Sequence, residues 1–242
     1  MTLVAAAIVP AAPALLPRMG GAADPLRPLR QVSREAVADA VASAPGAGVV
    51  VVSGWGHSDS GGAARRPVRR DWPLDAPSGA ERFTTGQVPP GALPTGLEIG
   101  RQLLADGTEA RLVSVADDAA PHECLALGAD LVADGPTVLV VVADGSAKRT
   151  VKAPGHLDER AEGFDAGLSR ALAAADADAL AALDPVLADE LWCRGRAALQ
   201  VLAGAAGGSP FAPSVDHDEA PYGVGYLVAT WTPPPRSRPT TQ

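Results

Sequence analysis

Uninterrupted runs of apolar residues, bounded by proline or glycine, are the strongest pattern along this chain. Segment 48–53 holds four consecutive valines, and segment 137–142 is similarly apolar. A strand in which polar and apolar residues do not alternate is covered on both faces, which is typical of a parallel sheet between layers of helices. The pattern predicts five strands, at residues 3–9, 48–53, 111–115, 137–142 and 223–231.

Between these strands, apolar residues recur every three or four positions, which predicts amphipathic helices. The helices expected from this spacing cover residues 28–44, 94–106, 121–133, 158–175, 177–183, 186–193 and 195–205. Alternating strands and helices predict an α/β fold, a single-domain sandwich with a central, mostly parallel or mixed sheet flanked by helices. We expect the domain to span residues 1–232 and residues 233–242 to form a disordered tail.

The segment 56–90 interrupts this alternation. It is rich in glycine, proline, serine and arginine, with four arginines between positions 65 and 70 and Trp72 close by. It follows the carboxyl end of the valine strand, the edge at which open α/β sheets bind their ligands. We expect a long loop here, which is either a lid or binding loop or a solvated insertion.

Composition limits the classes of partner. The chain has 242 residues, 47% of them hydrophobic, and acidic residues outnumber basic ones 28 to 20 for a net charge of −8. An acidic chain has no overall field for nucleic acid or an anionic membrane, so we expect neither as a partner. Its apolar stretches are shorter than the roughly 18 residues of a membrane span. Two cysteines are too few for a disulfide framework and suit a cytoplasmic location.

Several enzyme classes lack their usual motifs. The sequence contains no phosphate-binding P-loop, no Gly-x-Gly-x-x-Gly turn and no nucleophile elbow. Residues 59–62 read Asp-Ser-Gly-Gly, as around the nucleophile of some serine proteases, but no histidine precedes position 57. We therefore interpret this match as coincidental.

Three places carry candidate chemistry. His57 follows a buried strand, where a histidine is either a metal ligand or general base or an exposed loop residue. The polar run 215–219 directly precedes the last predicted strand and offers metal-capable side chains, although such runs are also common in solvated turns. After strand 137–142, Gly145 and Ser146 form either a backbone nest for an anion, with Lys148 and nearby basic residues, or a plain turn.

Four segments together resemble the class III extradiol ring-cleavage dioxygenases, in particular a small branch related to their catalytic B subunit. They are Val-Pro-Ala-Ala-Pro-Ala-Leu-Leu-Pro at 9–17, Ser-Gly-Trp-Gly-His at 53–57, Val-Ala-Asp-Gly-Ser-Ala at 142–147 and Pro-Tyr-Gly-Val-Gly-Tyr at 221–226. The resemblance covers nearly the whole chain. It implies a single α/β domain and a non-haem Fe(II), held by two histidines and a carboxylate, that cleaves a catechol with O₂.

The resemblance also assigns roles to individual residues. The position of the first iron ligand is Ala11, the second ligand is His57, and the acid/base position holds Arg149. Alanine has no lone pair for iron, and a guanidinium does not exchange protons near neutral pH. The candidates for the last ligand are Asp216, His217 and Glu219, and the candidate substrate-binding residues are Ser146, Lys148 and Tyr222.

Two hypotheses follow. In the first, the protein is an Fe(II)-dependent dioxygenase or related oxygenase with a rearranged site around His57 and the 216–219 cluster. In the second, the fold is kept without metal chemistry or cofactor, and the protein binds a small aromatic or anionic molecule or another subunit, with homo-oligomers possible. In that hypothesis Arg149, Lys148 and the arginines at 65–70 hold the anionic ligand.

Overall fold

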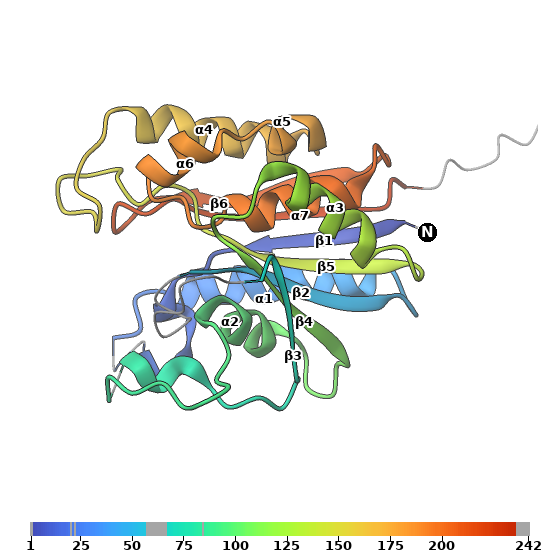
Figure 1. Cartoon of the computed structure of the whole chain (residues 1–242), viewed down its shortest axis with the longest axis horizontal. Coiled ribbons are helices and arrows are strands. Elements are labelled where there is room, and N and C mark those ends of the chain that lie inside the picture. The colour runs from blue at the N-terminus through green and yellow to red at the C-terminus, as the bar shows by residue number, and fades with distance from the viewer. Residues whose placement is uncertain (1, 20, 22, 57–66, 84, 236–242) are drawn as a thin grey trace, which may run out of the picture.

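A mixed β-sheet runs through the centre of the molecule (Figure 1). The computed structural model describes residues 2–19, 21, 23–56, 67–83 and 85–235. In this part of the chain seven strands lie in the order β3-β4-β2-β5-β1-β7-β6. Their bounds are β1 (Leu3–Val9), β2 (Gly48–Trp55), β3 (Arg69–Trp72), β4 (Ala110–Ala116), β5 (Thr137–Val142), β6 (Ala212–Glu219) and β7 (Tyr226–Thr232).

The four central strands, β4, β2, β5 and β1, are parallel, whereas β3, β7 and β6 are antiparallel to their neighbours. Helices cover both faces of the sheet (Figure 1). One face packs against α1 (Arg27–Ala42) and α2 (Thr95–Leu103). The other lies under α3 (Pro121–Leu131), α4 (Arg160–Ala173), α5 (Ala177–Ala181), α6 (Pro185–Glu190) and α7 (Arg196–Ala206). The predicted α/β sandwich is therefore confirmed.

Two hydrophobic cores, one on each side of the sheet, explain the apolar runs. Every residue of β5 is buried, because successive side chains enter opposite cores. Short 3-10 helices at Pro13–Leu15, Pro17–Met19 and Gly79–Phe83 lie in connections beside the sheet. None of the helices in the described ranges is long and apolar enough to cross a membrane.

The structure corrects two predictions about secondary structure. Residues 212–219 form β6, a strand that the sequence pattern did not predict. Its neighbour in the sheet is β7 and its other side is the sheet edge, so its side chains are exposed or half-buried and it lacks an apolar signature. The prediction of a loop across residues 56–90 is wrong at two places, where the chain forms β3 and the 3-10 helix Gly79–Phe83. Residues 57–66, the centre of that prediction, lie outside the described residues.

Helices α3 and α7 pack closely through two glycines. A Cβ atom on Gly128 of α3 would overlap the carbonyl oxygen of Val201, and one on Gly204 of α7 would overlap that of Leu125. Helix α7 packs on the central strands, and its close contact with α3 fixes the position of the segment that enters α7.

Replacement of Gly128 by alanine is expected to lower the free energy of unfolding by about 1–3 kcal/mol, because the added methyl group overpacks the contact. The matched control is Gly163→Ala in α4, where a Cβ would meet no atom within 4 Å. There we expect stability to rise by about 0.5–1 kcal/mol, because alanine favours the helix. Urea unfolding of both variants checks this, and equal effects would contradict the described packing.

Candidate functional site

A cleft of about 570 Å³ opens at the carboxyl ends of the four parallel strands. The connections after β1 and β2 lead to α1 and α2 on one face, and those after β4 and β5 lead to helices on the other face. Where connections diverge in this way, open α/β sheets leave a crevice for ligands. The cleft is lined by Ala11, Pro13, Ser53, Gly54, Gly56, Phe83, Thr95, Gly96, Asp117, Val142, Ala143, Asp144, Arg194 and Gly195.

The backbone of Arg194 and Gly195 forms one wall of the cleft. A Cβ on Gly195 would overlap the carbonyl oxygen of Asp144, just after β5, and a Cβ on Gly54 of β2 would lie 2.8 Å from the carbonyl oxygen of Arg194. Glycine at these two positions lets the segment before α7 lie directly on the ends of two strands. The wall is therefore fixed by backbone contacts, while the Arg194 side chain stays 63% exposed.

Two buried arginines hold other parts of the rim. Arg30 of α1 donates to the carbonyl oxygens of Leu15 (2.6 Å) and Ala14 (3.0 Å), which fixes the segment after β1. Arg196 of α7 donates to the carbonyl oxygens of Asp117 and Ala119, both at 2.6 Å, which fixes the segment after β4. Because these carbonyl groups are satisfied by charged donors, the rim segments are held against the helices beneath them.

Asp144 is a titratable group in the lining of the cleft whose pKa is strongly shifted. Its carboxylate accepts a hydrogen bond from the backbone N–H of Ala11 at 2.7 Å. Burial raises the pKa of Asp144 from its usual 3.8 to about 7, the hydrogen bond from Ala11 opposes the rise, and the charge of Asp165 adds to it. A carboxyl group with a pKa near neutrality, in a cleft, is suited to donate or accept a proton.

The thiol of Cys193 contacts the backbone of Asp144, but it is not a nucleophile. Its Sγ donates to the carbonyl oxygen of Asp144 at 3.5 Å, and burial raises its pKa to about 12. A thiol with this pKa is protonated at neutral pH, whereas the thiolate is the reactive form. The neighbouring Tyr226 is buried at the start of β7, and burial, followed by the charge of Asp144, raises its pKa as well.

Two positive elements face the same cleft. Of the described lining residues, Arg194 alone carries a positive charge, and its ion pairs with Asp117 and Asp189 are both 3.5 Å long. The first turn of α2 contributes Thr95 and Gly96 to the lining, and no described side chain caps this helix. Backbone N–H groups at a helix start are free to bind an anion, which the helix dipole also favours.

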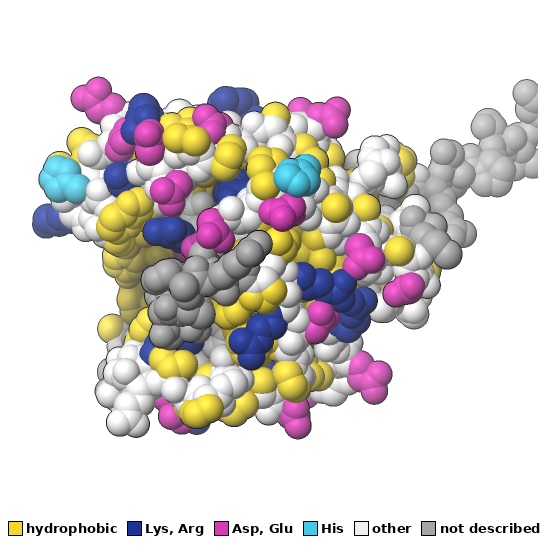
Figure 2. Space-filling view, in the orientation of Figure 1, with side chains coloured by type: hydrophobic (Ala, Val, Ile, Leu, Met, Phe, Trp, Pro, Cys, Tyr) yellow, Lys and Arg dark blue, Asp and Glu magenta, His cyan; other side chains and the backbone are white. Residues whose placement is uncertain are grey.

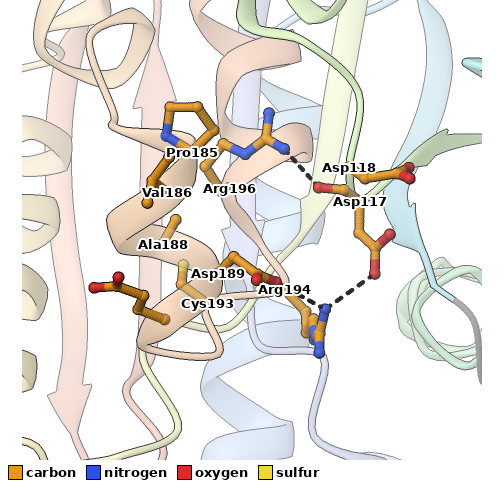
Figure 3. Close-up of a pocket in the computed structure, with 10 residues that line it drawn as sticks. Asp117, Asp118, Pro185, Val186, Ala188, Asp189, Cys193, Arg194 and Arg196 are labelled. Carbon is orange, nitrogen blue, oxygen red and sulfur yellow. Dashed lines mark hydrogen bonds and ion pairs between the residues drawn. The ribbon is translucent and has the colours of Figure 1, made fainter.

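A second hollow of about 440 Å³ adjoins the cleft and shares Asp117 and Arg194 with it. It lies between α6 and the segment after β4, as Figure 3 shows. Its other described lining residues include the carboxylates Asp118, Asp189 and Glu190. The guanidinium of Arg194 stands between Asp117 and Asp189, at the boundary of the two hollows (Figure 3).

The predicted anion nest holds a side chain of the protein itself. Ser146 is fully buried, and both its N–H (2.7 Å) and its hydroxyl (2.8 Å) donate to the carboxylate of Asp165 in α4. Arg149 donates to the same carboxylate at 3.2 Å. Neither Ser146 nor Arg149 lines the cleft.

The remaining candidates lie apart from the cleft. The Lys148 ammonium is 5.6 Å from the ring centre of Trp192, and Tyr222 is 48% exposed in the turn before β7. Asp216, His217 and Glu219 lie on the edge strand β6, and β7 separates them from β1. The substrate-binding and ligand roles of these residues stay predictions. His57 falls outside the described residues.

The donors of the cleft do not fit a site with two histidines and one carboxylate. Its described lining offers the carboxylates Asp117 and Asp144 but no imidazole, and Ala11 has no donor atom in its side chain. Across the described ranges, no group of three or more His, Cys, Asp or Glu side chains is placed to hold a metal ion. In sequence, His57 directly follows Gly56, which lines the cleft.

Sequence reasoning missed Arg194, Asp117 and the start of α2 as parts of the site. A signal existed for Asp117 and Asp144, because each follows an apolar strand almost directly. Arg194 lies between two helices in the sequence, where no strand end marks it. Comparison of the sequence with protein-family models finds no match, and comparison with curated proteins finds no significant one.

The raised pKa of Asp144 predicts a pH-dependent stability. Between its unfolded value near 3.8 and its folded value of about 7, the native protein keeps a proton that the unfolded chain has lost. The contribution of the Asp144 carboxyl group to stability is therefore full at low pH. This contribution falls as the pH rises through the window, by up to about 1.4 kcal/mol per pH unit.

Asp144→Asn is expected to lack this slope, so the difference in stability between wild type and the variant should change with pH across this window. The measurement is urea unfolding at several pH values from about 4 to about 8. Asp39→Asn, an exposed carboxylate of α1, controls for the change in charge. A constant difference between wild type and Asp144→Asn across this range would contradict the raised pKa.

Proposed function

We propose that the cleft binds a small anionic molecule, such as an aromatic carboxylate. One observation carries this proposal: Arg194, the start of α2, which no described side chain caps, and Asp144, whose pKa lies near 7, meet in one cleft. Arg194 and the helix N-terminus attract the negative charge. The volume of the cleft, about 570 Å³, lies within the range of small-molecule sites.

Asp144 sets the protonation state in which the anion binds. When it is protonated, Asp144 is neutral and can donate a hydrogen bond to the ligand. When it is ionised, it adds a second carboxylate to the lining, which also contains Asp117, and it repels an anion. In its ionised form it can also accept a proton from a ligand hydroxyl group, which would make it a general base.

Apolar groups in the lining favour a ligand with a flat hydrocarbon part. Phe83, Pro13, Ala11 and Val142 contribute to the lining. Phe83 is 39% exposed, so its ring is accessible to a ligand. An aromatic ring packed against these side chains would leave its carboxylate to Arg194 and α2.

Binding of benzoate tests the proposal. By calorimetry we expect benzoate to bind at least about tenfold more tightly at about pH 5.5 than at about pH 8.5, because ionised Asp144 repels it. Arg194→Met should weaken binding about tenfold, since one charged partner is lost. The matched control is Arg34→Met, an exposed arginine of α1. Benzyl alcohol, which has a similar ring without the charge, should bind without this pH dependence. Equal affinity of Arg194→Met and wild type for benzoate would overturn the proposal.

The second candidate is a metal-dependent oxygenase of the extradiol type. The four sequence segments and the sequence position of His57, next to the cleft residue Gly56, favour it. This candidate needs ligands for Fe(II) beyond the carboxylates Asp117 and Asp144 that the described lining of the cleft offers. The described donors alone are too few for such a site.

Metal analysis separates the two candidates. If the protein binds ligands without iron, purification with Fe(II) should leave it substoichiometric in iron, and His57→Ala should change neither its metal content nor its benzoate affinity. Stoichiometric iron that is lost in His57→Ala, together with O₂ uptake on addition of catechol, would establish the oxygenase instead. Asp39→Asn serves as the control variant.

A further inference from the structure

Three segments that are distant in sequence meet around Lys148. The N–H of Asp158 donates to the carbonyl oxygen of Lys148, and the N–H of Arg149 donates to that of Gly223, both at 3.0 Å. The N–H of Ala147 donates to the carbonyl oxygen of Leu191, also at 3.0 Å. In Figure 1 the β5–α4 segment and the β6–β7 turn lie at the same end of the molecule. We call the surface formed by residues 147–158, 191–192 and 222–223 the Lys148 surface.

Large apolar side chains gather on the Lys148 surface. Val151 is 61% exposed, Tyr222 48%, Leu157 46% and Trp192 44%. Single exposed apolar residues are normal, whereas several on one surface mark an interaction site. Figure 2 shows apolar side chains beside basic and histidine side chains at this end of the molecule. Of the four tryptophans, the other three are at most 8% exposed.

Trp192 has a left-handed backbone conformation, which residues other than glycine rarely adopt. Its φ is 57°, and that of His156 on the same surface is 61°. Left-handed values are uncommon for residues other than glycine and persist where the surroundings enforce them. The Trp192 side chain is exposed despite this conformation, and the Lys148 ammonium lies 5.6 Å from the centre of its ring. Core packing therefore does not explain why a tryptophan occupies this position.

Basic residues outnumber acidic ones on the Lys148 surface, which holds Lys148, Arg149 and Lys152 but a single carboxylate, Asp158. Lys148 and Lys152 are the chain's only lysines. Neither forms an ion pair with a carboxylate in the described ranges. Among the neighbouring carboxylates, Asp158 and Glu190 pair with Arg160, and Glu162 pairs with Arg149, whereas Glu159 is exposed. The whole chain has a net charge of −8, whereas basic residues are in the majority on this surface.

We infer that the Lys148 surface docks an acidic segment of another protein, with an apolar side chain of that segment packed against Trp192. Exposed tryptophan and tyrosine dominate the energetics of protein interfaces, and lysines steer an acidic partner. A second copy of this chain fits less well, because a two-fold contact would bring the lysines of both copies together. An anionic membrane is disfavoured by the net charge of −8.

The probe is a short fluorescein-labelled peptide of alternating glutamate and leucine, titrated with the full chain and followed by anisotropy. We expect saturable binding that weakens with added salt, and affinity about tenfold lower for an all-glutamate peptide, which lacks the apolar anchor. Trp192→Gly and the double variant Lys148→Glu/Lys152→Glu should each weaken binding about tenfold. Val88→Ser and Arg34→Glu, exposed residues elsewhere, should leave it unchanged.

Thermal unfolding separates a docking role of Trp192 from a structural one. Glycine adopts the left-handed conformation without strain, so Trp192→Gly should melt at the same temperature as wild type or higher. A lower melting temperature with unchanged peptide affinity would overturn the inference. Equal affinity for the two acidic peptides would also overturn it. So would tighter binding to phosphatidylserine vesicles than to the glutamate–leucine peptide, or a dimer of the chain that Trp192→Gly dissociates.

Discussion

The contact between the Arg194–Gly195 backbone and the ends of β2 and β5 is the constraint on which the cleft depends. Only glycine at 54 and 195 permits this approach, because a Cβ at either position would collide with backbone. The contact fixes one wall of the cleft, covers Asp144 from one side and leaves the Arg194 side chain exposed. Arg30 and Arg196 hold the neighbouring rim segments, so the cleft is built mainly from backbone held by buried charged donors.

The same arrangement determines the pKa of Asp144. Burial disfavours the ionised form of Asp144 more strongly than the hydrogen bond from Ala11 favours it, and the pKa rises to near neutrality. Burial raises the pKa of Asp165 as well, but its carboxylate is occupied by hydrogen bonds from Ser146 and Arg149. The carboxyl group of Asp144 is thus available to a ligand, whereas that of Asp165 stabilises the β5–α4 connection.

The sequence predicted the core of the fold well, because valine runs such as 49–52 and 138–142 report burial on both faces. It did not predict β6, whose polar side chains face solvent at the sheet edge. Of the segments singled out from the sequence, those after β1 and β5 contribute Ala11 and Asp144 to the lining of the cleft. The nest at Ser146 could not be resolved from sequence, since its occupant, Asp165, comes from a helix 19 residues away. Arg194 is brought to the cleft by tertiary packing alone.

The central claim is that Asp144 titrates near neutrality in a cleft that attracts anions. The most direct measurement is a carbon-13 NMR titration of the Asp144 carboxyl group, assigned by comparison with Asp144→Asn, in the absence and presence of benzoate. The account predicts a midpoint at about pH 7 that moves upward when benzoate binds, because the bound anion favours the protonated form. A midpoint close to the ordinary value of 3.8, unaffected by benzoate, would contradict it.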